Sequence, residues 1–240
     1  MNEVITQLFE RKSVRVFTEQ EISQENKNLI LDAAAHAPTA GNQQLYTILD
    51  ITDQSIKDKL VDTCDHQPFI AQGKLVLIFC ADCLKWYEAF AYAGCEPRMP
   101  GVGDLMLAVN DAVIAAQNAV VAAHSLGLGS CYIGDITENY EEQKALLGLP
   151  EYVFPVAMLV FGYPTQQQLR REKPPRSPRE LIVHENGYHR MDAQQLQRLL
   201  EVKSGQPDYT QWLRAFCKRK YNSDFSREMT RSVKKYLEEF

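Results

Sequence analysis

Apolar residues recur along the chain with two spacings, one typical of helices and one typical of buried strands. The first stretch, residues 4–9, has apolar side chains at helical spacing and predicts an N-terminal helix with one apolar face. A second helix is expected to begin near Ser23, a favourable N-cap residue. It should end before Pro38, because the residue that precedes a proline avoids helical geometry.

Short apolar runs predict the strands. They cover residues 46–51, 75–80, 130–133 and 156–161, and a helix-like stretch at 56–64 lies between the first two. Strands and helices therefore interleave along most of the chain, which predicts an α+β fold: a sheet flanked by helices, with a helical C-terminal extension.

The stretch from residue 104 to 126 is rich in alanine and predicts a long helix that is apolar on most sides. Such a helix is expected to be buried. Its small side chains would allow close approach of neighbouring backbones, as in a central helix or at a subunit interface. An ordinary core helix explains the same pattern without a dimer, so both interpretations stay open.

The composition changes after residue 165. Residues 166–179 are polar, basic and interrupted by prolines, which predicts an irregular surface arm or linker. Amphipathic helical patterns resume near Asp192 and close with a helix that begins at Ser223 or Asp224. We therefore expect a main domain over residues 1–190 and a helical extension over residues 191–240 packed on it.

Charge and hydropathy exclude several classes of protein. The formal net charge of −5 argues against a general affinity for nucleic acid. No uninterrupted apolar run reaches the ~18 residues that span a bilayer, so no membrane partner is expected. The N-terminus begins with polar residues and has no apolar signal core, so we expect a cytoplasmic protein.

Cys80 and Cys83 have the C-x-x-C spacing of redox and zinc sites. A thioredoxin-like pair lies at a helix N-terminus, where the thiol pKa is lowered, whereas Cys80 closes an apolar run that predicts burial. A zinc site needs further ligands, and no second C-x-x-C is present. We expect buried structural thiols, a reducing compartment and no metal site.

Two polar segments near the N-terminus carry candidate chemistry. Arg11, Lys12, Ser13 and Arg15 place three cations and a hydroxyl within five residues, and such groups suit the oxygens of a phosphate. The turn at 38–44 is rich in amides, which suit the edge of a flat heteroaromatic ring. Together with a third basic segment downstream, they predict a site for a phosphorylated ring cofactor.

Five segments, in their order along the chain, resemble the FMN-dependent nitroreductase superfamily. They are residues 11–17, 38–44, 127–134, 161–164 and 173–176. A sixth segment, 183–188, is similar to the subgroup of NADPH-preferring nitroreductases and flavin reductases. The likeness spans most of residues 1–190, which would then be the FMN-binding domain.

The resemblance implies a fold, an assembly and a set of cofactor residues. The fold would be a central mixed sheet of four or five strands, in a homodimer with FMN at the interface and the helix at 104–126 within that interface. The implied FMN-binding residues are Arg11, Lys12, Ser13 and Arg15 at the phosphate and ribityl chain; Thr39, Asn42 and Gln44 at the ring or ribityl chain; Tyr132, Ile133 and Gly134 near the reactive face; and Lys173 and Arg176 at the phosphate or pyrimidine edge.

Two departures from the family pattern affect the assignment of FMN-binding residues in this chain. An extra proline in the basic arm leaves open whether Arg171 or Lys173 makes the contact with FMN. Asp135 stands where a small or apolar residue is expected, which affects the placement of that loop.

The implied activity is an NAD(P)H-dependent flavin oxidoreductase that reduces nitroaromatics, quinones or free flavin by ping-pong hydride transfer. The flavin carries the chemistry, so no catalytic side chain is expected. NADPH is favoured over NADH by the subgroup likeness and by cations such as Arg190 and Lys203. Three alternatives remain: a non-catalytic FMN-binding protein, another flavin reaction on the same scaffold, and a thiol–disulfide oxidoreductase using Cys80 and Cys83. The physiological acceptor is left open.

Overall fold

The computed structural model describes residues 1–206 and 208–240, and its contacts divide the chain into two compact units. Unit 1 comprises Met1–Arg171 and Glu228–Phe240, and unit 2 comprises Glu172–Arg227. The functional boundary at residue 190 stays a prediction.

The centre of unit 1 is a four-stranded sheet with the order β1-β2-β4-β3. Its strands are β1 (Tyr46–Asp50), β2 (Leu75–Asp82), β3 (Gly129–Ile133) and β4 (Val153–Gly162). A sheet flanked by helices confirms the α+β class. All three strand pairs are antiparallel, so the expectation of a mixed sheet, with parallel and antiparallel pairs, is wrong. Among the described residues, one parallel pairing lies beside the sheet, the isolated bridge between Ser13 and Ser130. Strand direction depends on how the connections turn, which the apolar pattern of a strand does not encode.

Alternation along β2 divides the core between the two faces of the sheet. Leu75, Leu77 and Phe79 belong to one apolar cluster, whereas Val76, Ile78 and Cys80 belong to the other. All eight residues of β2 are buried, as expected for a strand covered on both faces.

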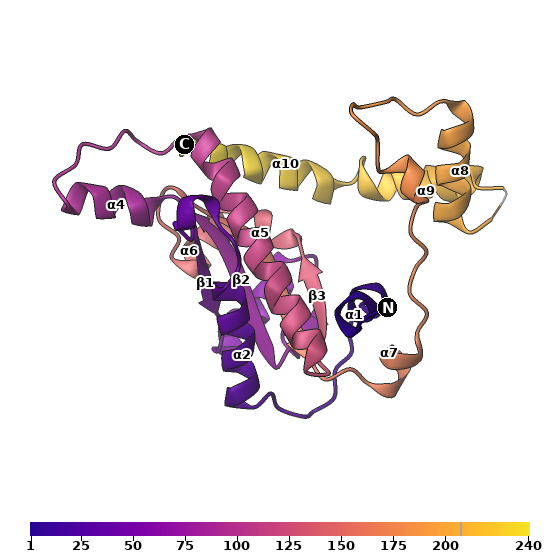
Figure 1. The fold of residues 1–240 in the computed structure, drawn as a ribbon, viewed down its shortest axis with the longest axis horizontal. Helices are drawn as coiled ribbons and strands as arrows, with labels where there is room; N and C mark the ends of the chain where they lie inside the picture. The colour runs from indigo at the N-terminus through magenta and orange to yellow at the C-terminus, as the bar shows by residue number, and fades with distance from the viewer. Residues whose placement is uncertain (207) are drawn as a thin grey trace. The chain divides into compact units, whose positions relative to one another are not determined.

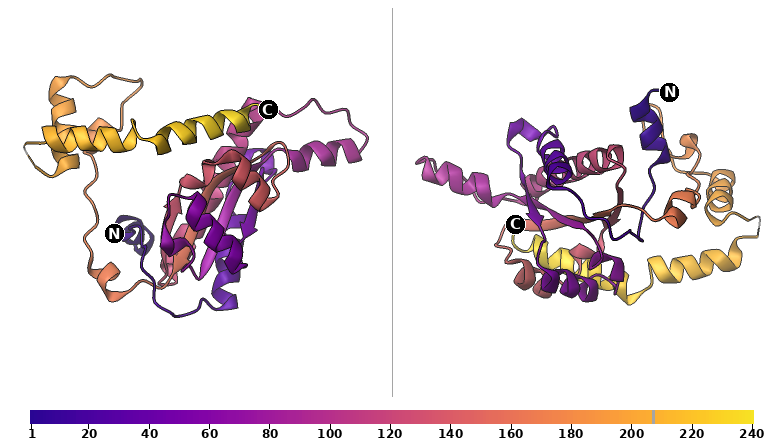
Figure 2. Two further views of the ribbon diagram at one scale, coloured as in Figure 1. Left: turned by 180° about the vertical axis from the view of Figure 1, so that it is seen from behind. Right: turned by 90° about the horizontal axis from the view of Figure 1, so that it is seen from below.

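Helices cover both faces. α5 (Val102–Ser125) crosses the first face with α2 (Gln24–Ala35) beside it (Figure 1). α3 (Gln54–Thr63) and α6 (Tyr140–Leu147) contribute to the cluster on the opposite face, which is seen from behind in Figure 2.

α5 is the predicted alanine-rich helix, and its small residues face the sheet. Ala108, Ala112, Ala115, Ala116, Ala119 and Ala123 have no exposed surface. By length and composition this helix could cross a membrane, although Asp104, Asn110 and Asp111 interrupt its apolar sequence. In the structure its alanine face instead packs in the protein core.

Several predicted helix starts are confirmed by their caps. The Ser23 hydroxyl accepts a hydrogen bond from the Asn26 amide at 3.2 Å, and α2 begins at the next residue. Asp192 caps α8 through a capping box. The Ser223 hydroxyl accepts from the Ser226 amide at 3.2 Å, where α10 begins.

The remaining helices of the described chain complete the two units. They are α1 (Glu3–Glu10), α4 (Leu84–Tyr92), α7 (Gln166–Arg170), α8 (Ala193–Ser204), α9 (Thr210–Lys220) and α10 (Asp224–Leu237), with 3-10 turns η1 (Ala40–Asn42), η2 (Pro68–Ile70), η3 (Asp135–Thr137) and η4 (Arg179–Leu181). α7 corrects the prediction of an irregular arm over 166–179. The prolines of this segment begin only at residue 174, so no proline prevents a short helix over residues 166–170.

Candidate functional site

The basic segment near the N-terminus lies against the end of the sheet where β3 begins and β4 ends. The Val14 amide donates to the Ser130 carbonyl at 2.9 Å. Two glycines permit this close approach: a Cβ on Gly129 would lie 2.6 Å from Val14 Cγ2, and one on Gly162 would lie 2.7 Å from Phe17 Cγ. We call residues 11–15 the clamp segment.

The clamp segment gathers two guanidinium groups and a hydroxyl around the first residues of β3. The Arg11 guanidinium lies 5.8 Å from the centroid of the Tyr132 ring. Burial raises the pKa of the Cys131 thiol, while Arg15, Ser13 and Arg11 all act in the opposite direction, which places these three side chains around that thiol. The structure therefore brings Arg11, Ser13 and Arg15 together near Cys131, and their contact with FMN stays a prediction.

Lys12 has a different role from its neighbours. Its ammonium group donates to the carbonyl of Leu169 at 2.8 Å and to the carbonyl of Arg171. The Arg171 guanidinium in turn donates to the carbonyl of Ser13. Lys12 thus fastens the C-terminal end of α7 to the clamp segment, and Arg171 lies beside it as a further cation.

The amide turn around η1 is strained and internally hydrogen-bonded. The Thr39 hydroxyl accepts from the Gln44 amide at 3.2 Å, and the Gln44 side chain donates to Asn42 Oδ1 at 2.8 Å. Asn42 and Gln44 have positive φ angles of 56° and 46°, a conformation that is uncommon outside glycine and is frequent at functional sites.

Asp111 of α5 holds both ends of this turn. Its Oδ1 accepts from the Ala40 amide at 2.9 Å and its Oδ2 from the Leu45 amide at 3.2 Å. The side chain is buried, with the residue only 3% exposed. Sequence reasoning missed Asp111, although it is the single acidic residue between positions 105 and 134 and stands within an alanine-rich run.

The loop that follows β3 offers backbone rather than side-chain groups. Ile133 is 1% exposed, so its side chain is unavailable to a ligand. Gly134 is exposed, and a Cβ placed on it would meet no atom within 4 Å. Tyr132 donates to Gln117 Oε1 at 3.3 Å, and burial raises its pKa to about 12, so its hydroxyl stays protonated.

Within one chain, the predicted FMN-binding residues of unit 1 lie at two opposite edges of the sheet. The clamp segment and residues 132–134 lie at the β3 edge of the sheet, whereas the amide turn leads into β1 at the opposite edge. Three inter-strand steps of ~4.8 Å put the two edges ~14 Å apart. Lys173 and Arg176 belong to unit 2, and their contact with a cofactor stays a prediction.

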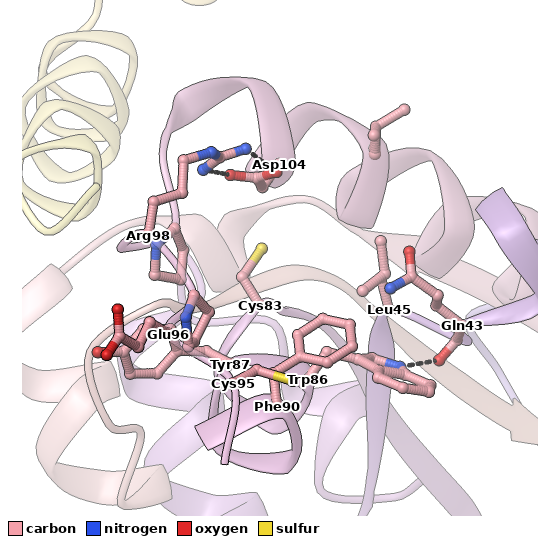
Figure 3. A pocket seen from close by; sticks show the side chains of 13 residues that line it. Gln43, Leu45, Cys83, Trp86, Tyr87, Phe90, Cys95, Glu96, Arg98 and Asp104 are labelled. Atoms are coloured by element: carbon pink, nitrogen blue, oxygen red, sulfur yellow. Dashed lines mark hydrogen bonds and ion pairs between the residues drawn. The ribbon is translucent and has the colours of Figure 1, made fainter. Parts of the chain in front are cut away.

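A cavity of about 370 Å³ adjoins the amide turn. Trp86, Tyr87 and Phe90 of α4 line it, as Figure 3 shows. The Trp86 indole donates to the Gln43 carbonyl at 2.6 Å, which ties α4 to the turn. At the wall of this cavity, Arg98 and Asp104 form a bidentate ion pair at 2.6 and 2.9 Å.

Cys80 and Cys83 do not form a reactive pair. Both are buried, at 0% and 5% exposure, and carry free thiols. Burial raises the pKa of each thiol to about 12, so neither is a thiolate near neutral pH. Cys83 does stand at the start of α4, but burial outweighs any lowering of its pKa by the helix end. The thiol–disulfide alternative is not favoured.

Comparisons with known proteins agree with this geometry. The model of the family described as "Nitroreductase family" matches residues 8–163. The chain is 32% identical to an FMN reductase [NAD(P)H] of Bacillus subtilis over 99% of this chain and 92% of that protein. It is 34% identical to an oxygen-insensitive NADPH nitroreductase of Salmonella typhimurium over 82% and 80% of the two chains. The crystal structure of nitroreductase A from Vibrio parahaemolyticus superposes with a TM-score of 0.85 at 25% identity, covering 99% of this chain and 98% of the other.

Proposed function

The chain belongs to the nitroreductase family, and we propose that it is an FMN-dependent NAD(P)H oxidoreductase that reduces nitroaromatics, quinones or free flavin. The observation that carries the proposal is the clamp segment, with Arg11, Ser13 and Arg15 gathered beside an open loop at Gly134.

The donor set fits a flavin mononucleotide. Guanidinium groups and a hydroxyl suit a phosphate because they form charge-assisted, multiply hydrogen-bonded contacts with its oxygens. The open space beside Gly134 allows a flat ring to approach the backbone closely. The exposed amide of Asn42 can pair with polar ring atoms. Arg171 is added to this set because it hydrogen-bonds to the clamp segment itself.

The site is completed, in this proposal, by a second copy of the chain. The amide turn lies at the opposite edge of the sheet from the clamp segment, so one chain does not supply both to a single ring. α5 also exposes a row of large apolar side chains, namely Val102, Met106, Leu107, Val113 and Ile114. An exposed apolar stripe on a helix is typical of an interface. A homodimer that buries this stripe would place the turn of one protomer at the clamp segment of the other.

The protein's own residues bind and orient the cofactor, while FMN, when bound, supplies the hydride chemistry. Arg11 and Arg15 are proposed to neutralise the phosphate, and Lys12 keeps the clamp segment attached to the C-terminal end of α7. Asp111 holds the amide turn in the conformation that presents Asn42 and Gln44. Tyr132 is protonated and hydrogen-bonded to Gln117, so it shapes the site without exchanging a proton.

Either nicotinamide can serve as reductant, and we propose a preference for NADPH. Relatives with NADPH in their names include the Salmonella nitroreductase. Arg190 and Lys203 of unit 2 are exposed cations that suit the additional phosphate of NADPH. The free thiols of all six cysteines fit a reducing, cytoplasmic compartment.

Steady-state kinetics test the proposal against a non-catalytic FMN-binding protein. The purified protein should oxidise NADPH in the presence of a nitrofuran, a quinone or added FMN, with the parallel double-reciprocal plots of a ping-pong cycle. A yellow protein that oxidises neither NADPH nor NADH with any of these acceptors would be a binding protein instead.

A further inference from the structure

A buried carboxyl group lies directly after the loop proposed to meet the flavin. Residues 132–134, which are the end of β3 and the following Gly134, lead into η3, and Glu138 caps the C-terminal end of that 3-10 turn. Glu138 is only 5% exposed, and its Oε1 has no hydrogen-bond partner among the described residues. Neither the family resemblance nor the proposed function assigns it a role.

Asp135, the first residue of η3, connects this loop to the chain before β2. Its Oδ2 accepts from Gln67 Nε2 at 2.9 Å, and the same nitrogen donates to the Cys64 carbonyl at 3.0 Å. Phe69 follows two residues after Gln67, and the Arg15 guanidinium lies 5.9 Å from the centroid of its ring. The carboxylate of Asp135 therefore links the loop after β3 to a segment in contact with the clamp.

The charges that act most strongly on Glu138 are acidic. Asp135 lies in its own turn, Asp65 follows α3, and Glu228 comes from α10. The nearby Arg231 is already held by Glu228 at 2.8 Å and by Glu141 at 2.7 Å. The Cys64 thiol is also close, and its pKa is raised to about 12, chiefly by burial. A buried carboxylate without a cation is costly, so such a group retains its proton.

The Glu138 carboxyl group is buried in this way and retains its proton. Burial, followed by the charge of Asp135, raises its pKa to about 8. At neutral pH it is thus a carboxylic acid with one proton to donate, and Asp135 is its hydrogen-bond partner.

We propose that Glu138 is a positioning residue for the flavin loop: as a neutral acid it donates a hydrogen bond to Asp135, which keeps Asp135 on Gln67 and the backbone of Gly134 in place. The proposal rests on the proposed function only in that residues 132–134 meet FMN. Loss of the proton leaves two adjacent carboxylates, which repel each other and displace the loop.

The pH dependence has a defined sign. Folding raises the pKa of Glu138 from 4.5 to about 8, so its contribution to stability is full below pH 4.5 and is lost as the pH rises through 8. Binding of FMN acts on the folded protein alone, so its affinity should fall only as the pH passes about 8.

Glu138→Gln tests this, because glutamine donates the same hydrogen bond at every pH. Two readouts are needed: the FMN dissociation constant from pH 6 to 9.5, and the thermal midpoint of the flavin-free protein over the same range. Wild-type protein should lose affinity severalfold above pH 8 and lose thermal stability between pH 6 and 8, whereas Glu138→Gln should change much less in both. Glu138→Ala should bind FMN more weakly than Glu138→Gln at pH 7. Glu142→Gln, an exposed change on α6, is the matched control.

Parallel pH profiles for wild type and Glu138→Gln would overturn the proposal. The thermal readout separates this failure from failure of the proposed function. If the protein bound no FMN, the difference between the two flavin-free profiles would still show whether the proton of Glu138 holds the loop.

Discussion

The carboxylate of Asp111 accepts a hydrogen bond from the backbone amide of Leu45 at 3.2 Å, across 66 residues of sequence. Its other oxygen accepts from Ala40, so one buried side chain sets both ends of the amide turn. The turn's positive φ angles are uncommon for non-glycine residues, and such conformations persist only where their surroundings hold them.

Asp111→Ala should therefore release the turn. Two charge-assisted hydrogen bonds are lost, one from a buried amide and one from a part-buried amide. We expect this loss to lower the free energy of unfolding by about 2–4 kcal/mol. FMN affinity should fall as well, because Asn42 and Gln44 are no longer presented. Chemical denaturation and FMN titration measure the two effects. The exposed neighbour variant Asn110→Ala should show neither, and an unchanged affinity in Asp111→Ala would remove the turn from the site.

Arg15→Ala should weaken FMN binding without a comparable loss of stability. Its side chain is exposed, and a charge-assisted contact with a phosphate is worth about 1.5–3 kcal/mol, or roughly 10- to 100-fold in affinity. Quenching of flavin fluorescence measures the dissociation constant. Lys59→Ala removes an exposed cation from α3 and is the control for net charge. Equal affinities for wild type and Arg15→Ala would exclude Arg15 from the clamp.

A mixing experiment tests whether the site is shared between two chains. Arg15→Ala and Asn42→Ala/Gln44→Ala each damage every site of their own homodimer. In a random mixture, half of the dimers are hybrids with one intact site, so about a quarter of the wild-type sites should return. A mixture of Arg15→Ala with Arg11→Ala, which damage the same half-site, should restore none. A lack of recovery in the first mixture, with hybrid formation verified by two tags, would contradict the shared site.

The ion pairs of Arg231 in α10 predict an acid sensitivity. Arg231 hydrogen-bonds to Glu141 and Glu228, and this contact lowers the pKa of each carboxyl to about 2. A lowered pKa in the folded state contributes stability above pH 4.5 that is lost as the pH falls through 2. Arg231→Met should thus show a smaller drop in thermal midpoint between pH 6 and pH 3 than wild type. Arg227→Met, whose partner Asp224 is fully exposed, should keep the wild-type profile.

The cysteines should be distinguishable by reactivity. Cys95 and Cys217 are exposed, whereas Cys64, Cys80, Cys83 and Cys131 are buried. An aromatic disulfide reagent should modify the two exposed thiols rapidly and the rest only on unfolding. Cys83→Ala should retain NAD(P)H oxidation, and loss of turnover in a folded, FMN-loaded Cys83→Ala protein would reopen the thiol mechanism.

The sequence predicted helices and caps well where neighbouring residues determine them. Ser23 is an N-cap because its hydroxyl meets a helix amide within three residues, and the alanine spacing of α5 reports a face that must lie close to a sheet. The convergence of Arg11, Ser13 and Arg15 also follows from their closeness in sequence.

Features set by distant contacts were not predictable in the same way. The antiparallel direction of every strand pair depends on the connections, and Asp111 acts through amides about 70 residues away. The acidic surroundings of Glu138 include Asp65 and Glu228 of α10, which no local pattern joins to it. The separation of the clamp and the amide turn became visible only with the strand order.

Anaerobic mixing of the purified, FMN-loaded protein with NADPH tests the central claim most directly. The account predicts that the visible absorption of the bound flavin bleaches within the turnover time and returns when a quinone is added. A protein that takes up no FMN, or whose bound flavin keeps its oxidised spectrum with both NADPH and NADH, would contradict it.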